Sequence, residues 1–386
     1  MNSAIPETLS LASSSQGLYI HIPFCSSRCS YCDFATDLES VGDREDYMRI
    51  LFQEMESFAK IPLFLDSIYF GGGTPSLLGE EIIGSILEAV RSHWSLSEDI
   101  EITLEANPES ITPESMSGFL AGGVNRFSVG IQSFHDRELK YLGRRHLVSQ
   151  NFDAIRILSE ASIRCNADLM IGIPLQTRES LGENIKSLME FDVKHVSAYM
   201  LSIEQGAPWY EAVRSGKLPM ESEEQCADLY TYFLESMDSF GFTHYEISAF
   251  SLPGEECRHN LKYWRNQDYL GIGPSAASYL GNYRFQNQRG LKKWISQIKG
   301  EESFENFEYI HSKNAILDTI MLRFRLKEGL QASRLAQWNA DFPELEISQK
   351  VERLETRGLI EKQAMRYRLS NMGILFANEV FLEFLE

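Results

Sequence analysis

Short runs of β-branched and aromatic residues alternate with longer segments of helical periodicity through the first two thirds of the chain. A strand, a helix and a further strand at such intervals pair in parallel through right-handed crossovers. The pattern therefore predicts an α/β fold built on a parallel sheet, with ligands bound at the carboxyl ends of its strands. The expected strands cover residues 17–22, 66–70, 101–105, 126–131, 164–172, 195–201 and 243–248.

The last part of the chain follows a different pattern, which begins near His311. Three helical segments are followed by two short strand-like runs, an order typical of a winged-helix-type module. Its acidic side chains favour an interaction or lid role over DNA binding. We expect four parts: an N-terminal lead (1–16), a core (17–281), a polar connector (282–310) and the C-terminal module (311–386).

The charge of the chain disfavours several classes of partner. Its 386 residues include 36 basic and 55 acidic side chains, a formal charge of −19, which fits poorly with nucleic acid or anionic lipid. No apolar stretch reaches the roughly 18 residues of a membrane span. The first 16 residues contain no Lys or Arg, unlike a secretory or transit peptide. We therefore expect a cytoplasmic protein, and its six cysteines are too sparse for a disulfide scaffold.

Three of these cysteines share one loop. Cys25, Cys29 and Cys32 form a C-x3-C-x2-C pattern directly after the first expected strand. Three thiolates on a tight loop can hold three corners of a cubane iron–sulfur cluster, which leaves the fourth iron open to a chelating ligand. Zinc is the alternative, but a structural zinc site takes four ligands in paired spacing, and no second pair lies nearby. The loop favours a [4Fe–4S] cluster with one open iron.

Glycines and polar residues stand at the ends of the following strands. The glycine run 71–73, followed by Thr74, lets backbone N–H groups approach a ligand that a Cβ would keep away. The next strands and the helical segment after them contribute Glu105, Gln132, Arg144 and Asp168. Together these groups supply the donors and acceptors that a zwitterion and a ribose require.

Six segments resemble, in this order, the radical S-adenosylmethionine proteins related to oxygen-independent coproporphyrinogen III oxidase. They are LYIHIPFCSSRCSYCDF, YFGGGTPS, LEANPES, NRFSVGIQSFHDRELKYLGRRH, DLMIGIPLQT and HVSAYMLSIEQGAPWY. The resemblance implies a partial (β/α)6-type barrel with a C-terminal winged-helix-like module. It also implies a [4Fe–4S] cluster on the three cysteines, with S-adenosylmethionine chelating the open iron. Carried over by position, the S-adenosylmethionine contacts are Tyr19, Tyr31, Gly72, Gly73, Thr74, Glu105, Gln132, Arg144 and Asp168.

Two features divide this family. The oxidases carry a further cysteine two residues after the cluster loop, where this chain has Phe34, as the HemW-type heme chaperones do. The hexamer HNLKYW (residues 259–264) matches the H-N-x-x-Y-W motif of the same chaperones. The resemblance therefore implies a protein that binds heme and transfers it to acceptor proteins such as respiratory enzymes. An electron donor for the cluster is a further implied partner.

The residues of the hexamer alone permit two interpretations. His259 can ligate heme iron while Tyr263 and Trp264 cover the porphyrin face. Alternatively, His259 is a hydrogen-bonded core residue and the two aromatic rings fill hydrophobic space. Many relatives have a histidine shortly after the hexamer, where this chain has Ala277, so any contribution of that side chain is missing.

Two functions thus follow from the sequence. The first is a heme chaperone that carries a [4Fe–4S] cluster and an S-adenosylmethionine site. The second is an oxygen-independent coproporphyrinogen III oxidase, which decarboxylates two propionates of its substrate oxidatively. Phe34 and the hexamer favour the first.

Overall fold

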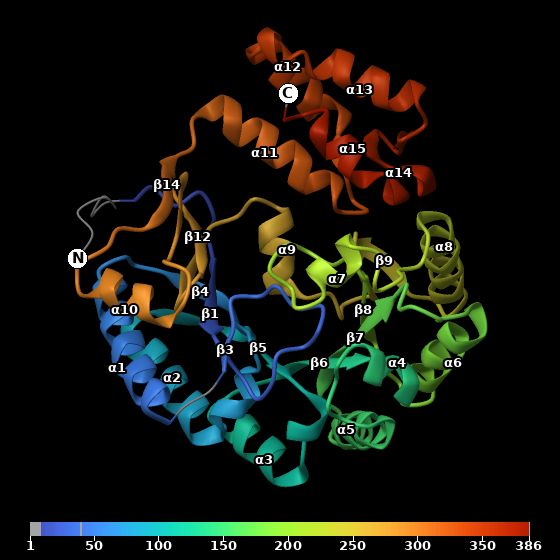
Figure 1. The fold of residues 1–386 in the computed structure, drawn as a ribbon. Coiled ribbons are helices and arrows are strands. Elements are labelled where there is room, and N and C mark those ends of the chain that lie inside the picture. The colour runs from blue at the N-terminus through green and yellow to red at the C-terminus, as the bar shows by residue number, and fades with distance from the viewer. Residues whose placement is uncertain (1–8, 39–40, 386) are drawn as a thin grey trace.

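The computed structural model describes residues 9–38 and 41–385. Residues 1–8 of the expected N-terminal lead and Glu386 of the C-terminal module lie outside the described residues. Six neighbouring parallel strands form the centre of the molecule, in the order in which the chain makes them (Figure 1). They are β1 (Gln16–Ile22), β4 (Phe64–Gly72), β5 (Ser95–Ala106), β6 (Arg126–Gln132), β7 (Arg164–Ile171) and β8 (His195–Met200). The α/β barrel fold predicted from the sequence is confirmed.

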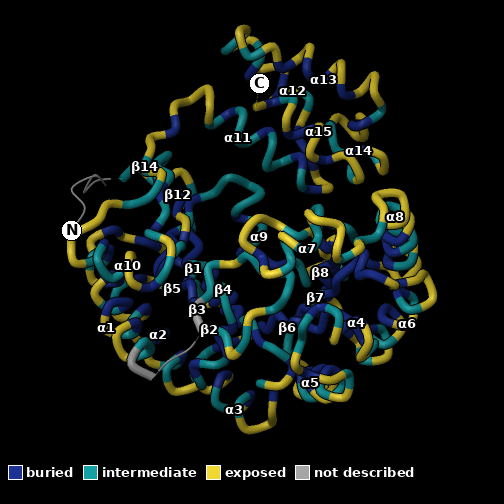
Figure 2. Tube along the Cα trace, in the orientation of Figure 1, coloured by how far each residue is buried: buried dark blue, intermediate teal, exposed yellow. Residues whose placement is uncertain are grey.

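Long helices lie outside this sheet (Figure 1). They are α1 (Val41–Phe58), α2 (Glu80–His93), α3 (Pro113–Gly122), α5 (Val148–Glu160), α6 (Arg178–Met189) and α8 (Glu223–Ser239). Thr112, Thr177 and Ser222 begin three of them, because each side chain accepts a hydrogen bond from the backbone three residues later. All seven residues of β6 are buried, since helices cover the sheet (Figure 2). Two short helices, α4 (Asp136–Tyr141) and α7 (Tyr210–Arg214), lie in connections.

The seventh expected strand occupies a different place from the one predicted. It forms β9 (Thr243–Glu246), and the chain then turns back to form β10 (Ala249–Ser251). β10 pairs antiparallel with β8, and β9 pairs antiparallel with β10 at the outer edge of the sheet. The short β9–β10 turn therefore inserts a strand where a parallel neighbour of β8 was expected.

The other side of the sheet is extended by residues after 268. β11 (Tyr269–Ile272) pairs in parallel with β1. Antiparallel strands β12 (Ala277–Leu280), β13 (Tyr283–Gln286) and β14 (Glu305–Tyr309) follow, with α10 (Leu291–Ile298) between the last two. Residues 282–310, expected as a polar connector, thus contain two strands of the sheet and a helix. Buried Phe285 and Trp294 pack this segment against the core, although most of the residues around them in the sequence are polar.

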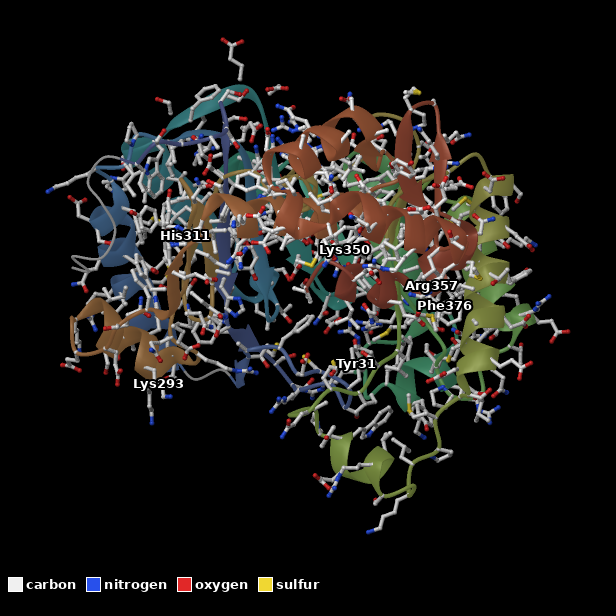
Figure 3. The ribbon with its side chains drawn as sticks, turned by 90° about the horizontal axis from the view of Figure 1, so that it is seen from above. Tyr31, Lys293, His311, Lys350, Arg357 and Phe376 are labelled. Atoms are coloured by element: carbon white, nitrogen blue, oxygen red, sulfur yellow. The ribbon has the colours of Figure 1, made fainter. Side chains whose placement is uncertain are left out.

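The C-terminal part has a hydrophobic core of its own. Its first elements are α11 (Ser312–Phe324), β15 (Leu330–Gln331), α12 (Ala332–Asp341), α13 (Ile347–Thr356), β16 (Ile360–Gln363) and β17 (Arg366–Leu369). The three strands form one small sheet, which confirms the winged-helix-type arrangement. Two short helices that the sequence did not predict follow: α14 (Asn371–Leu375) and α15 (Ala377–Leu382). In the view from above, this part lies over the barrel, and Tyr31 remains outside its outline (Figure 3).

No helix in residues 9–38 and 41–385 is long and apolar enough to cross a membrane.

Candidate functional site

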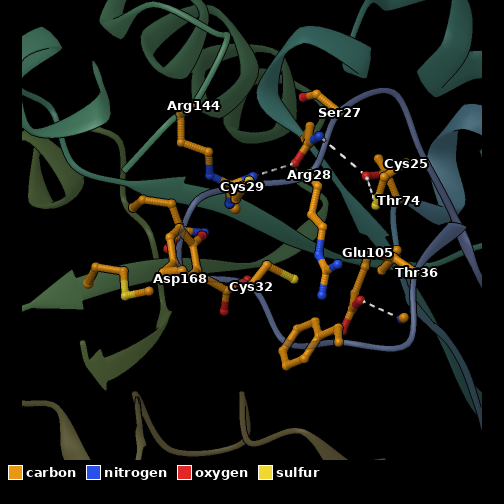
Figure 4. Close-up of a pocket in the computed structure, with 18 of the residues that line it drawn as sticks. Cys25, Ser27, Arg28, Cys29, Cys32, Thr36, Thr74, Glu105, Arg144 and Asp168 are labelled. Carbon is orange, nitrogen blue, oxygen red and sulfur yellow. Dashed lines mark hydrogen bonds between the residues drawn. The ribbon is translucent and has the colours of Figure 1, made fainter. Parts of the chain in front are cut away.

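The cysteine loop leaves the sheet at the carboxyl end of β1. It runs between two short paired strands, β2 (Phe24–Cys25) and β3 (Asp37–Leu38). Cys25, Cys29 and Cys32 are free thiols that line one cavity of about 360 Å³ (Figure 4). The Cys32 N–H donates to the Cys29 carbonyl at 3.3 Å, which closes a tight turn within the loop.

The glycine run after β4 packs directly on this loop. The Gly73 N–H donates to the Ile22 carbonyl at 2.7 Å, and the Thr74 N–H donates to the Phe24 carbonyl at 2.8 Å. A Cβ on Gly73 would lie 2.4 Å from the Phe24 oxygen and 3.0 Å from Cys25 Sγ. Only glycine therefore fits at this position. The Thr74 hydroxyl donates to Cys25 Sγ at 3.8 Å.

Two carboxylates from β5 and β7 line the same cavity. Glu105 accepts hydrogen bonds from the Tyr69 hydroxyl at 2.9 Å and the Gly72 N–H at 3.1 Å. Asp168 accepts one from the Asn166 amide at 2.7 Å. Burial raises the pKa of Glu105 to about 7 and the pKa of Asp168 to about 6. Both groups can therefore ionise near neutral pH when a cationic ligand enters.

Three further residues complete the wall. Arg144 Nη1 donates to Asn107 at 3.2 Å, while its buried Nε has no hydrogen-bond partner among the described residues. Gln132 is buried and has φ of 65°, a conformation that is uncommon for a non-glycine residue. Tyr31 lies on the cysteine loop, and burial raises its pKa to about 12. The unpaired Nε of Arg144 is a donor ready for an anionic group.

These residues fit the groups that the cysteine spacing predicts. Three thiols surround one cavity whose wall contains no fourth cysteine. In the described part of the chain, no three His, Cys, Asp or Glu side chains lie close enough together to share one metal ion. The cavity also gathers most of the expected S-adenosylmethionine contacts: Tyr31, Gly72, Gly73, Thr74, Glu105, Gln132, Arg144 and Asp168.

The remaining expected contact, Tyr19, lines a second cavity of about 770 Å³. Its hydroxyl and His21 Nδ1 form a hydrogen bond of 3.0 Å. The two cavities share part of their walls, so they adjoin. The shared residues are Asp33, Phe34, Gly72 and Glu105. Phe34 is 63% exposed, and its ring therefore stands open between the two spaces.

The hexamer forms most of a short helix, α9 (Arg258–Trp264), behind β4. His259 has 0% of its surface exposed. Its Nδ1 forms a hydrogen bond of 3.0 Å with Ser67 Oγ, and its Nε2 forms one of 2.7 Å with the Tyr263 hydroxyl. Burial lowers its pKa to about 3, so the ring is neutral. The His259 ring is therefore a buried, hydrogen-bonded side chain that does not lie in the cavity wall.

The other half of the hexamer does reach the second cavity. Tyr263 and Trp264 line it, and Lys262 turns the opposite way, forming a 2.7 Å ion pair with Asp66. The guanidinium of Arg325, from the C-terminal part, lies 5.1 Å from the centre of the Trp264 ring. The helix is therefore fixed to β4 on one side and to the C-terminal part on the other.

Some residues of the second cavity were missed by the sequence analysis. Arg284 and Arg289 line it, and both lie in or next to β13, where a connector was expected. Arg289 Nη2 donates to the Asp33 carbonyl at 2.8 Å and so touches the cysteine loop. The sequence analysis also missed Tyr69, whose hydroxyl donates a hydrogen bond to Glu105. Its position in the YFGGGTPS segment, close to the glycines, could have identified it as a residue near the site. Ala277 is exposed on the same cavity.

A mostly parallel sheet with three thiols and a glycine run at its carboxyl edge defines the radical S-adenosylmethionine class of protein. The pattern of the Radical SAM superfamily matches residues 19–188, and that of the HemN C-terminal domain matches residues 310–376. The solved structure of coproporphyrinogen III oxidase (HemN) from Escherichia coli superposes with a TM-score of 0.82. It covers 96% of this chain and 90% of that chain at 22% identity, so this likeness shows the fold.

Curated relatives identify the family more narrowly. Heme chaperone HemW of Lactococcus lactis is 32% identical over 369 residues, which are 95% of this chain and 96% of the relative. Heme chaperone HemW of Bacillus subtilis is 32% identical over 373 residues, covering 95% and 98%. The chain belongs to the HemW family.

Proposed function

We propose that this protein is a heme chaperone, which binds heme and transfers it to acceptor hemoproteins in the cytoplasm. The names of its relatives support heme as the cargo. The observation that carries the proposal is the second cavity, because Tyr263 and Trp264 of the hexamer both line it. Its volume of about 770 Å³ falls within the range of cofactor sites, roughly 300–1,000 Å³. Aromatic walls suit a flat, largely apolar porphyrin.

We further propose that Cys25, Cys29 and Cys32 hold a [4Fe–4S] cluster, with S-adenosylmethionine in the first cavity. A reduced cluster and this ligand together supply one-electron cleavage of a sulfonium C–S bond. The protein's own role is to bind and orient S-adenosylmethionine. The unpaired Nε–H of Arg144 can donate a hydrogen bond to a carboxylate, and Glu105 can accept hydrogen bonds from an ammonium or hydroxyl group. An electron donor is a further proposed partner.

The coproporphyrinogen III oxidase is the second candidate. The shared wall of the two cavities favours it, because a porphyrinogen in the second would lie beside S-adenosylmethionine in the first. Against it stands Phe34, at the position where the oxidases carry a further cysteine. The hexamer at the second cavity also favours the chaperone.

The test uses the full chain after anaerobic reconstitution of the cluster. We expect saturable binding of heme, and no repeated conversion of coproporphyrinogen III in the presence of reductant and S-adenosylmethionine. Trp264→Ala removes an aromatic wall of the second cavity and should weaken heme binding. Phe376→Ala is the matched control, because Phe376 is an exposed aromatic residue of the C-terminal part (Figure 3). Multiple turnovers of substrate without heme saturation would establish the oxidase instead.

A further inference from the structure

His259 has no nitrogen left for heme iron. Nδ1 is engaged by Ser67 and Nε2 by Tyr263. The ring is also enclosed, because a Cβ added to Gly17 of β1 would lie 3.1 Å from its Cε1. To ligate iron, the ring would have to break both hydrogen bonds and leave its place between the strands.

Tyr263 is the hexamer residue that brings a possible iron ligand to the second cavity. It lines that cavity, and a phenolate oxygen is an established axial ligand of heme iron. We infer that the Tyr263 oxygen binds the iron of heme, and that His259 is a positioning residue that holds this oxygen. The inference rests on the proposed heme binding and adds the atom that contacts the cargo.

Hydrogen bonding through His259 makes the phenolate possible. Ser67 carries a hydroxyl, which can either donate to Nδ1 or accept from it. When Ser67 donates, the neutral ring carries its proton on Nε2 and donates to the Tyr263 oxygen. The phenol proton then leaves to water in the cavity as the iron–oxygen bond forms. His259 stays neutral throughout, and its buried ring acquires no charge.

The second cavity is also lined by another tyrosine and histidine, Tyr19 and His21, which form a phenol–imidazole pair arranged differently. His21 Nε2 lies 2.9 Å from the Ala35 carbonyl. A carbonyl can only accept, so Nε2 carries the proton and Nδ1 must accept from the Tyr19 hydroxyl. A phenolate at Tyr19 would face the lone pair of Nδ1. The two pairs therefore differ in the one property that ligation requires, and this difference favours Tyr263.

The surroundings of Tyr263 suit the rest of the heme molecule. Arg284 and Arg289 line the cavity and supply guanidinium groups for propionates. Arg284 is already paired with Glu308 and Asp318, whereas the Arg289 side chain donates a hydrogen bond to the Asp33 carbonyl. Arg289 is therefore the arginine that can turn to a propionate at lower cost.

The experiment compares the ferric heme complexes of the wild type, Tyr263→Phe and Tyr19→Phe. The readouts are heme affinity, the phenolate-to-iron charge-transfer band and the resonance Raman modes of an iron-bound phenolate. We expect Tyr263→Phe to lose the phenolate signature and roughly 30-fold in affinity. Tyr19→Phe should keep the phenolate signature, because only the Tyr263 oxygen is inferred to bind the iron. The iron–sulfur content of each variant reports whether the barrel is folded.

Variants of His259 test the positioning role. Gln can accept from Ser67 and donate to Tyr263, so His259→Gln should keep the phenolate signature, whereas His259→Ala should weaken it. Retention of the signature in Tyr263→Phe would overturn the inference. So would an imidazole-type wild-type spectrum that disappears in His259→Ala and persists in Tyr263→Phe. A wild type that binds no heme would overturn the proposed function as well, so the two failures are distinguishable.

Discussion

The ring of Tyr69 stacks on the imidazole of His259, with centroids 5.2 Å apart and planes inclined by 27°. The hydroxyl of the same tyrosine donates to Glu105 in the wall of the first cavity. His259 in turn contacts Tyr263 in the wall of the second. One side chain therefore links the cofactor cavity to the residues expected to bind heme.

Tyr69→Phe separates the two contacts of this side chain. The ring and its stacking on His259 remain, but Glu105 loses a hydrogen-bond donor. Glu105 is then held less firmly in the wall of the cavity, so S-adenosylmethionine affinity should fall by about 10-fold. Isothermal titration with S-adenosylmethionine measures the effect, and heme affinity serves as the internal control. A loss of heme affinity alone would contradict this division of roles.

Replacement of any cluster cysteine by alanine should abolish the iron–sulfur absorption. Cys25, Cys29 and Cys32 line the same cavity, and its wall offers no fourth cysteine as a substitute. Cys226→Ala is the matched control, because Cys226 is a free thiol outside the wall of that cavity. Iron and sulfide analysis after anaerobic reconstitution gives the result. A full cluster in Cys29→Ala would refute the assignment.

The affinity for S-adenosylmethionine should rise with pH. Burial raises the pKa of Glu105 from 4.5 to about 7 and that of Asp168 from 3.8 to about 6. The cationic ligand favours the ionised carboxylates, which form as pH passes through these values. The same shifts make the ligand-free protein lose stability as pH rises from about 4 to about 7, because the folded state retains protons longer than the unfolded state.

Glu105→Gln tests this dependence directly. The variant should lose the part of the pH dependence near 7, both in binding and in urea denaturation. An unchanged pH profile in the variant would show that another group titrates.

Much of the first cavity was predictable because parallel strands end at one edge of a sheet. Gly73, Glu105 and Asp168 follow that rule, and their strands were recognised from composition. Tyr19, expected as an S-adenosylmethionine contact from its position in a motif, lines the adjoining second cavity. The face of β1 from which its side chain emerges depends on the register with β4 and β11.

The environment of His259 could not be predicted for a different reason. Its Nδ1 partner, Ser67, is 192 residues away in sequence, and no local pattern joins the two. The same holds for residues 282–310, where Phe285 and Trp294 bury themselves against distant helices and strands. Sequence periodicity predicts individual helices and strands, whereas these contacts depend on how the helices and strands pack against one another.

Arg325→Ala should loosen the C-terminal part from the barrel. The guanidinium lies 5.1 Å from the Trp264 ring centre and 4.3 Å from the Phe381 ring centre, so it bridges α9 and α15. Two partly buried cation–π contacts are together worth about 1–3 kcal/mol. Limited proteolysis near residue 310 should therefore become faster.

Arg334→Ala is the control for this variant. Arg334 makes the same kind of contact with Trp338, but both residues lie on α12, within the C-terminal part. Equal acceleration of proteolysis in both variants would mean that the bridge has no special role.

A transfer experiment measures whether the chain delivers heme, as proposed. The reconstituted protein is loaded with ferric heme and mixed with an apo-hemoprotein whose holo form has a distinct absorption spectrum. We expect heme to move to the acceptor, at a rate that increases with acceptor concentration because transfer requires contact between the two proteins. Heme that stays on the chain, or leaves at a rate independent of the acceptor, would contradict it.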